Sequence, residues 1–438
     1  MAVQIPFATV AKIHQNAVVE DVFFTGLLQQ CQVDESAPQW LIDIRQESKG
    51  WLSGLSVPTR KDEDWRFIDL TSLTAGKYVA ASDSVGAIYE SIPETKHSHL
   101  VFVNGIYNRE LSDVSELPAG LYVGSLKDLP ADYDAAKYFA QQPGTDAFTT
   151  LNTAGGRDVA VVWVSKDAIA ATPVHLIFIA DGTQSACFAQ PRTLVVSETG
   201  SSLSLVEEYI GTGEYFTNAV TEVFVESNAR VNHTRLQQES ETSYHIGKTA
   251  ISQARDSHYT ISEFNLGAKL SRHNPEVWQQ GEQTETNLNG LVVATGEQTS
   301  DTHSIVALSK PYGTTKQLHK CIAGDRAHTV FNGKVFVPKE AQLTDATQLN
   351  HNLMLSPKAR VDTKPELQIT ADNVKCAHGA TVSQLEADEI FYLRSRGLSQ
   401  ADANQLLIDA FAAEIIDRIP LESLKTRITQ TIEQKVKH

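Results

Sequence analysis

The stretch NAVTEVFVESNARVNHTRLQQESETSYHIGKTAISQARDSHYTISEF, residues 218–264, decides the fold. It contains four short runs rich in β-branched and apolar residues, separated by clusters of Asn, Ser, Asp and Glu. Runs of this kind, bounded by turn residues, are typical of β-strands. Similar runs fill the chain from Arg157 to about Ala380, many of them recurring at roughly 10 to 16 residues. The sequence therefore predicts a mainly β protein.

Two architectures are compatible with this series of strands. One is a sandwich or barrel closed by Greek-key connections, and the other is a solenoid whose strands stack in parallel coils. The runs share no sharp consensus, but the series is long for a single sandwich. We therefore expect a β-helix-like solenoid.

The segments on either side of this series have different patterns. Apolar residues recur at helical spacing over 10–30 and 38–55, and Gly54 and Pro58 then end the second helix. The run HLVFVNG at 99–105 is β-like, and its Asn-Gly pair favours a tight hairpin turn. We expect four regions: a mainly helical N-terminal region (1–95), a β or mixed connector (96–156), the β-helix core (157–382) and a C-terminal helical region (383–438).

The C-terminal region carries clear helix signals. One helix stops at Gly397, and Ser399 with Asp402 resembles a capping box that opens a helix over 401–419. A last helix is expected over 421–438. We expect an apolar stripe on the middle helix formed by Leu406, Leu407, Ala410, Phe411, Ile415 and Ile419. The unpaired edge strands at the end of a solenoid promote aggregation, and terminal helices can cap them. Such capping is compatible with partner binding.

Composition excludes several classes of protein. The chain has 438 residues, and 37 basic against 53 acidic side chains give a formal charge of −16, which disfavours nucleic acid as a partner. No apolar run approaches the roughly 18 residues of a membrane-spanning helix. The N-terminal sequence lacks a secretion or transit pattern, so we expect a cytoplasmic protein. Four scattered cysteines argue against a disulfide scaffold.

No nucleotide-binding, zincin or hydrolase motif is present, so the candidate chemistry lies in cysteine and histidine pairs. Cys376 and His378 stand two residues apart on an expected strand, as do His319 and Cys321, so each pair shares one strand face. Thiolate and imidazole suit iron or zinc, but two ligands fall short of the four of a closed site. Taken alone, each pair is better explained by buried packing.

Two other classes of function stay open from the residues alone. A β-helix carbohydrate-active enzyme could use paired acids, either Glu207 with Glu208 or Glu222 with Glu226, although such acids more often lie on a solvated edge. A self-contained iron or zinc metalloprotein could draw on the nine histidines between His233 and His378.

Three motifs at the C-terminal end, and one near the N-terminus, carry a family resemblance. They are the C-x-H-G-A-T strand at 376–381, the FYLRSRGL helix end at 391–398, and the AF-x-x-E-x-I helix at 410–416. The segment DEDWRFIDL at 62–70, expected by itself to be a solvated turn anchored by Trp65 and Phe67, is the fourth. Together they resemble the SufB/SufD family of the SUF iron–sulfur cluster assembly system. His-Gly-Ala-Thr stands where SufB-like chains carry His-Glu-Ala-Thr, so the SufD branch is the nearer match.

The resemblance implies a right-handed parallel β-helix with helices at both ends, in a non-catalytic scaffold subunit that aids iron acquisition. It implies pairing with SufB through the β-helices, with His378, and Cys376 beside it, at the interface where a nascent cluster forms. It implies docking of the ATPase SufC on the C-terminal helices, for which we select Phe391, Leu407, Phe411 and Ile415. It also implies no tightly bound cofactor and transient iron or cluster at the interface, and it leaves open a homodimer when SufB is missing and a reduced flavin in the complex.

Overall fold

The computed structural model describes residues 21–31, 37–80, 89, 91–142 and 146–437. Of the helix expected over 10–30, residues 10–20 therefore lie outside the described residues, and the rest forms α1. The helices of the described chain are α1 (Val22–Gln30), α2 (Gln39–Leu52), α3 (Thr71–Thr74), α4 (Ala147–Gly155), α5 (Ala387–Ser395), α6 (Gln400–Ile416) and α7 (Glu422–Val436).

Nineteen strands within the described residues form one continuous sheet that winds into a solenoid. The early strands are β1 (Val79–Ala80), β2 (His99–Val103), β3 (Ile106–Asp113), β4 (Leu121–Ser125), β5 (Ala160–Val164), β6 (Val174–Ala189), β7 (Arg192–Ser197) and β8 (Ser202–Val225). The later strands are β9 (Arg230–Gln238), β10 (Tyr244–Gln253), β11 (His258–Asn265), β12 (Leu270–Gln279), β13 (Glu285–Ala294), β14 (Thr299–Ala307), β15 (Thr314–Ala323), β16 (His328–Val337), β17 (Asp345–Met354), β18 (Arg360–Ile369) and β19 (Lys375–Gln384).

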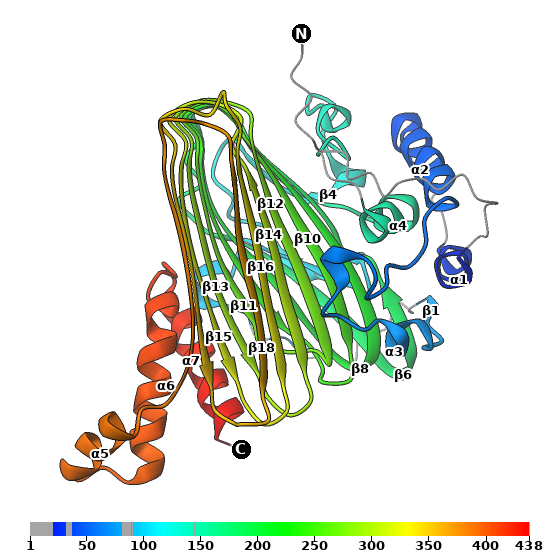
Figure 1. Ribbon diagram of the computed structural model, residues 1–438. Coiled ribbons are helices and arrows are strands. Elements are labelled where there is room, and N and C mark those ends of the chain that lie inside the picture. Colours follow the sequence, from blue (N-terminus) through cyan, green and yellow to red (C-terminus); the bar gives the residue numbers. More distant parts are fainter. Residues whose placement is uncertain (1–20, 32–36, 81–88, 90, 143–145, 438) are drawn as a thin grey trace.

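The solenoid is a parallel β-helix of about eight turns. Its strands pair in parallel with the strand two places further along the chain, so β10 pairs with β12 on one face and β11 with β13 on the other. The long strand β8 passes through both faces, pairing with β9 through its first half and with β10 through its second. Figure 1 shows the coils stacked from β6 and β8 on the right toward β18 on the left. The predicted β-helix with helical ends is confirmed.

In-register pairing stacks equivalent side chains on one another and creates ladders inside the β-helix. One apolar ladder runs through Val223, Ile251, Val277, Val306 and Val335, all of which are buried. Burial of each such side chain stabilises the fold by roughly 1.5–3 kcal/mol, which holds neighbouring coils in register.

A second ladder on the opposite wall of the interior is polar. Glu207, Arg235, Glu263, Gly290, His319 and Asn350 occupy equivalent positions in successive coils. Arg235 donates hydrogen bonds to Asn265 Oδ1 (3.0 Å) and to His245 Nε2 (2.6 Å). The alternation of an acid, a base and an acid allows three charged groups to be buried without a large uncompensated charge.

The N-terminal helices cover the first coils. Helix α2 buries Leu41, Arg45, Ser48 and Leu52, a spacing of three and four residues that defines one helix face. Figure 1 places α1, α2 and α4 together beside the β6 and β8 end of the stack. The expected hairpin at Asn104-Gly105 is confirmed: both residues have positive φ, and β2 pairs antiparallel with β3 across them.

The DEDWRFIDL segment crosses the outer face of the β-helix. Trp65 lies against the Arg272 guanidinium, 4.0 Å from the ring centroid, as the expected aromatic anchor. Its acids are not simply solvated, because Asp64 pairs with Lys334 (2.6 Å) and Glu63 pairs with Lys364 (2.8 Å). The segment thereby fastens the N-terminal region to several successive coils.

The C-terminal helices α6 and α7 pack along one side of the β-helix, as Figure 1 shows in orange and red. Ser399 caps α6 by accepting the Asp402 amide, and Gly397 (φ +100°) ends the preceding helix, both as predicted. The expected stripe on α6 is partly wrong. Leu406 and Ala410 face solvent, and the buried face is formed by Ala403, Ile408, Ala412, Ile415 and Ile416. Because α6 is apolar on two faces, the spacing of its apolar residues does not show which of the two faces is buried. No helix of the described chain is long and apolar enough to span a membrane.

Candidate interface site

The last strand of the β-helix, β19, carries Cys376 and His378, and among the described residues no further coil is stacked on it. In the register of β17 and β19, Cys376 pairs with Ala346 and His378 pairs with Gln348. Ala346 and Gln348 are buried, 2% and 1% exposed, because β19 covers them. His378 is exposed and Cys376 is half-buried. The interior face of the last coil is therefore open to a partner at this pair, in contrast to the burial expected for it from the residues alone.

The electrostatics of the open end favour a thiol over a thiolate in the chain alone. Partial burial raises the pKa of the Cys376 thiol, and the nearby Asp345 carboxylate raises it further, while a hydrogen bond from the Ala346 backbone opposes the shift. Metal ligation requires the thiolate. Cys376 would therefore have to lose its proton on coordination.

The second pair, His319 and Cys321, lies deep inside the β-helix. Both residues are 1% exposed, and Cys321 Sγ lies 3.5 Å from His319 Nδ1. Burial lowers the pKa of His319 to about 4 and raises that of Cys321 to about 12, so both are neutral at pH 7. The imidazole stacks on Phe331 at 4.7 Å. The expectation of buried packing is confirmed for this pair.

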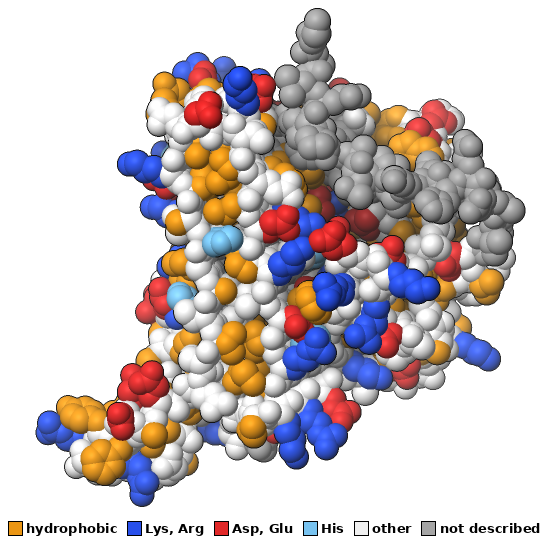
Figure 2. Space-filling view, viewed as in Figure 1, with side chains coloured by type: hydrophobic (Ala, Val, Ile, Leu, Met, Phe, Trp, Pro, Cys, Tyr) orange, Lys and Arg blue, Asp and Glu red, His pale blue; other side chains and the backbone are white. Residues whose placement is uncertain are grey.

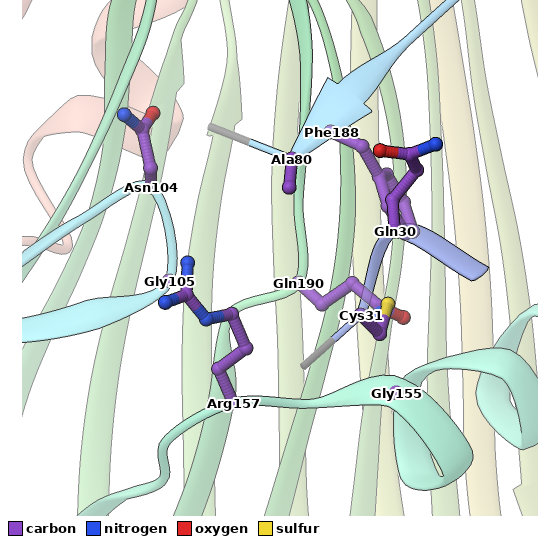
Figure 3. Close-up of a pocket in the computed structure, with 9 residues that line it drawn as sticks. All are labelled: Gln30, Cys31, Ala80, Asn104, Gly105, Gly155, Arg157, Phe188 and Gln190. Carbon is purple, nitrogen blue, oxygen red and sulfur yellow. The ribbon is translucent and has the colours of Figure 1, made fainter. Parts of the chain in front are cut away.

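The remaining cysteines, Cys31 and Cys187, are also free thiols. Cys31 Sγ accepts a hydrogen bond from Gln190 Nε2 (3.3 Å), and Figure 3 shows the two residues in a small pocket that Asn104 and Arg157 also line. Burial raises the pKa of Cys31 to about 11 and that of Cys187 to about 12. Neither is activated as a nucleophile, because nucleophilic attack requires the thiolate.

Of the paired acids weighed for a carbohydrate-active enzyme, Glu207, Glu208 and Glu222 are buried, so the solvated edge expected for them is wrong, and Glu226 is half-buried. Glu207 is 0% exposed and accepts from Thr221 (2.5 Å) inside the β-helix. Glu208, 3% exposed, pairs with His175 (3.0 Å) and with Arg427 of α7 (2.7 Å). Glu222 is buried against Arg192, and the half-buried Glu226 accepts from the Tyr138 hydroxyl. Three of the four acids are therefore buried in ion pairs or hydrogen bonds within the fold, which argues against their use as paired acids on a polysaccharide.

The histidines between His233 and His378 do not form a metal centre in the part of the chain that the structure describes, where no three His, Cys, Asp or Glu side chains are grouped to hold an ion. Several instead pair with buried carboxylates, such as His273 with Glu263 (2.5 Å) and His245 with Glu239 (2.6 Å). A metal ion held by this chain alone therefore has no ligand set among the described residues.

The four residues selected for SufC docking differ in exposure. Phe391 is 74% exposed on α5, next to the 57% exposed Tyr392. Figure 2 shows this apolar surface on the projecting helix at the lower left. Leu407 is half-buried, Phe411 packs against Lys320 (4.4 Å from Nζ to the ring centroid), and Ile415 is 0% exposed within the chain's own core. Of the four, Phe391 is the side chain most available to a partner, and the docking role stays a prediction.

Sequence reasoning missed the polar residues of the interior, among them Gln317, Gln348 and Arg235. The side chain of each points into the β-helix, whereas the side chains of its neighbours in the strand point outward. The signal was the recurrence of polar residues at equivalent positions of successive runs, which becomes visible only when the coil register is known.

The fold and the open end define a class of protein. It is a parallel β-helix that helices cover along its side, and its last coil is uncovered and carries a cysteine and a histidine. Comparison with known families is specific. The model described as "SUF system FeS cluster assembly, SufBD core domain" matches residues 178–411, and "SufBD protein N-terminal region" matches residues 23–176. The chain belongs to the SufBD family and has a role in iron–sulfur cluster assembly.

Individual relatives agree with this assignment. The chain is 46% identical to an iron–sulfur cluster assembly SufBD family protein of Synechocystis, over 97% of each chain. It is 35% identical to the chloroplastic protein ABCI7 of Arabidopsis thaliana, over 95% of this chain and 92% of that protein. It is 32% identical to the iron–sulfur cluster assembly protein SufD of Escherichia coli, over 87% of this chain and 89% of the relative. The relatives support a SufD-type subunit.

Proposed function

We propose that this chain is a non-catalytic scaffold subunit that pairs with SufB through the open end of its β-helix. The observation that carries the proposal is the exposure of His378 on β19, beside the half-buried Cys376. A histidine and a cysteine on the interior face of an uncovered coil can supply part of a ligand set, and the partner supplies the rest. A nascent cluster, or the iron from which it is built, is cargo at this interface.

SufC docks on the C-terminal helices in this proposal, chiefly through the exposed surface around Phe391. Helix α6 is joined to the β-helix by the Lys320–Glu414 ion pair (2.5 Å) and by the buried face that includes Ile415. Helix α7 is joined to it by the pair between Arg427 and Glu208. ATP-driven closure of SufC would pull on α5 and α6, transmit force to the coils beneath them, and shear the interface so that Cys376 and His378 admit iron and sulfide.

Two further parts of the proposal rest on the family resemblance. The complex acquires iron and uses a reduced flavin, neither of which is bound tightly by this chain alone. In the absence of SufB, the same open end pairs with a second copy of the chain. Within this proposal the complex works in the cytoplasm.

The ligand role is tested by co-expressing the chain with SufB and SufC and measuring iron and sulfide in the purified complex. We expect His378→Ala to lower both strongly while the complex keeps its size. His258→Ala is the matched control, because His258 is also partly exposed but lies on β11, far along the stack from the open end. Undiminished iron and sulfide in the His378→Ala complex would refute the ligand role.

The docking role is tested by placing a charge on the exposed helix. Phe391→Asp should abolish co-purification with SufC, because a carboxylate replaces an apolar contact. Trp51→Asp is the control, since Trp51 is 55% exposed on α2 at the other end of the molecule. Retention of SufC by the Phe391→Asp chain contradicts the assignment of this surface.

A further inference from the structure

A groove in the N-terminal region lies between helices α1 and α3, on the side of the molecule where Figure 1 shows both helices near β1. Its volume is about 890 Å³, within the range of roughly 300–1,000 Å³ that is usual for small-molecule sites. Three segments line it: α1, residues 57–61 and residues 69–78. None of the described residues that line it belongs to the open end of the β-helix, so the proposed function does not use this groove.

One part of the groove wall is apolar. It is formed by residues of all three segments: Phe23, Leu27, Val57, Leu70 and Tyr78. The rings of Phe23 and Tyr78 pack edge to face, with centroids 6.4 Å apart. Open space reaches the backbone of α1, because a Cβ atom added at Gly26 would meet no other part of the chain within 4 Å. A flat apolar group can therefore lie against this wall without moving the chain.

Another part of the wall is basic and carries Arg60, Lys61 and Lys77. All three side chains are exposed, and none forms an ion pair among the described residues. The acids Glu63 and Asp64, which follow in the same segment, are instead paired with lysines of the β-helix. Figure 2 shows basic side chains gathered on this side of the molecule, at the lower right.

The two carboxylates that line the groove, Asp21 and Asp69, are engaged by backbone amides. Asp21 accepts the amides of Phe23 (3.0 Å) and Val57 (2.9 Å). Asp69 accepts the amide of Thr71 (2.9 Å), and hydrogen bonds from that residue lower the pKa of its carboxyl group. Three cations against two carboxylates leave the groove with one positive charge, in a chain whose net charge is −16. Such a local field attracts anions.

A buried hydrogen-bond donor lies in the same wall. Tyr78 is 7% exposed, and its hydroxyl has no hydrogen-bond partner among the described residues. Gly76, which also lines the groove, lies against this hydroxyl, since a Cβ atom there would be 2.6 Å from it. Folded proteins rarely leave a buried hydroxyl unpaired. This donor is therefore expected to serve an oxygen atom of a bound group.

We propose that the groove binds a small aromatic phosphate, a molecule that joins a planar apolar ring to a phosphate group. The ring lies on the apolar wall, where Phe23 and Tyr78 offer aromatic surface. The phosphate lies among Arg60, Lys61 and Lys77, which donate hydrogen bonds to its oxygens. A phosphate ester carries about −1.5 to −2 charges at pH 7, which suits several unpaired cations better than one carboxylate does. An acidic peptide would use the cations but leave the apolar wall uncovered.

The test titrates the full purified chain with 1-naphthyl phosphate at pH 7 and measures binding by calorimetry. The ring alone is represented by 1-naphthol, and the charge alone by inorganic phosphate. We expect 1-naphthyl phosphate to bind, and each of the other two to bind more weakly by roughly tenfold or more, because each lacks one half of the recognised structure. Added salt should weaken the binding of 1-naphthyl phosphate, because salt screens exposed charges.

Substitutions locate the binding in the groove. Gly26→Leu should abolish it, because the new side chain fills the open space beside α1. Gly50→Leu is the matched control: Gly50 lies on α2, has the same open space around its Cβ position, and does not line the groove. Lys77→Gln should weaken binding by roughly tenfold, whereas Lys316→Gln, at an exposed position of β15, should leave it unchanged. Equal melting temperatures establish that each variant is folded, and Lys77→Gln decides the matter if Gly26→Leu melts early.

Absence of binding, equal affinity for 1-naphthyl phosphate and 1-naphthol, or native affinity in both Gly26→Leu and Lys77→Gln overturns the proposal. A short polyglutamate peptide that binds as tightly as 1-naphthyl phosphate would assign the groove to an acidic protein partner, and also overturns it. The measurement needs neither SufB nor SufC, so its outcome is independent of the proposed function.

Discussion

The chain contains the same local pattern twice, with opposite results. His319 and Cys321 stand two residues apart on β15, and Cys376 and His378 stand two apart on β19. The first pair is sealed inside the β-helix and is held neutral by burial. The second lies on the uncovered face of the last coil, where His378 is exposed.

The difference between the two pairs comes from their place in the stack. A coil in the middle is covered on both sides, so its interior side chains lose water and must satisfy one another. The last coil is covered on one side only, and its interior side chains keep a free face. Identical residue types therefore serve packing in one place and, in the function that we propose, offer ligands in the other.

The largest effect on the free energy of unfolding is expected from the loss of a charge inside the covered coils. Arg235→Met removes a buried positive charge that lies between Glu207 and Glu263 in the same ladder and helps to lower the pKa of both carboxyl groups. The two acids then keep only their histidine partners, His233 and His273. We expect the free energy of unfolding to fall by about 3–5 kcal/mol, measured by denaturant titration. Arg326→Met is the control, because its side chain is 66% exposed, and we expect a change within about 0.5 kcal/mol. A loss below about 1 kcal/mol for Arg235→Met would contradict the account of the interior.

The interior pair should also make stability depend on pH. The pKa of His319 is lowered to about 4 in the folded chain, so the unfolded chain binds the proton more readily. The contribution of His319 to the free energy of unfolding is therefore fully present above about pH 6.5. It falls by on the order of 3 kcal/mol as the pH drops toward 4. His319→Phe keeps a ring against Phe331 and should flatten that part of the profile. Parallel profiles for the two chains would show that His319 does not titrate in this way.

A smaller contrast is expected between the two cysteines. Cys321→Ala removes a fully buried sulfur and leaves a cavity, so we expect a loss of about 1–2 kcal/mol in unfolding free energy. Cys376→Ala removes a half-buried sulfur at the open end, and we expect less than about 1 kcal/mol. Equal losses would mean that the last coil is covered as completely as the middle ones.

The smallest effect on stability is expected at the residue to which we assign the ligand role. His378→Ala in the isolated chain should change the unfolding free energy by less than about 0.5 kcal/mol, because its side chain is exposed. A melting curve of the isolated chain measures this. A large destabilisation would indicate that His378 is a packing residue, and would remove the contrast with His319.

Much of the fold could be predicted because its signals are local. Turn residues between short apolar runs indicated the strands, and the Asn104-Gly105 hairpin, the Ser399 cap and the stop at Gly397 were each predicted from neighbouring residues. The spacing of Cys376 and His378 indicated only a candidate pair for which burial was the better explanation, and their interface role was implied by the family resemblance and stays a prediction. The orientation of α6 was predicted only in part, because Leu406 and Ile415 are equally apolar and only packing decides which of them is buried.

The sequence by itself determined the β-strand series, the helical ends and the family, because period, turns and short motifs are written in adjacent residues. Only the tertiary structure decided which coil is the last, and so which of two similar pairs is open to a partner. Coil register brings together residues some thirty positions apart, as it does Gln348 and His378. Burial is a property of that stack, and no local pattern in the chain encodes it.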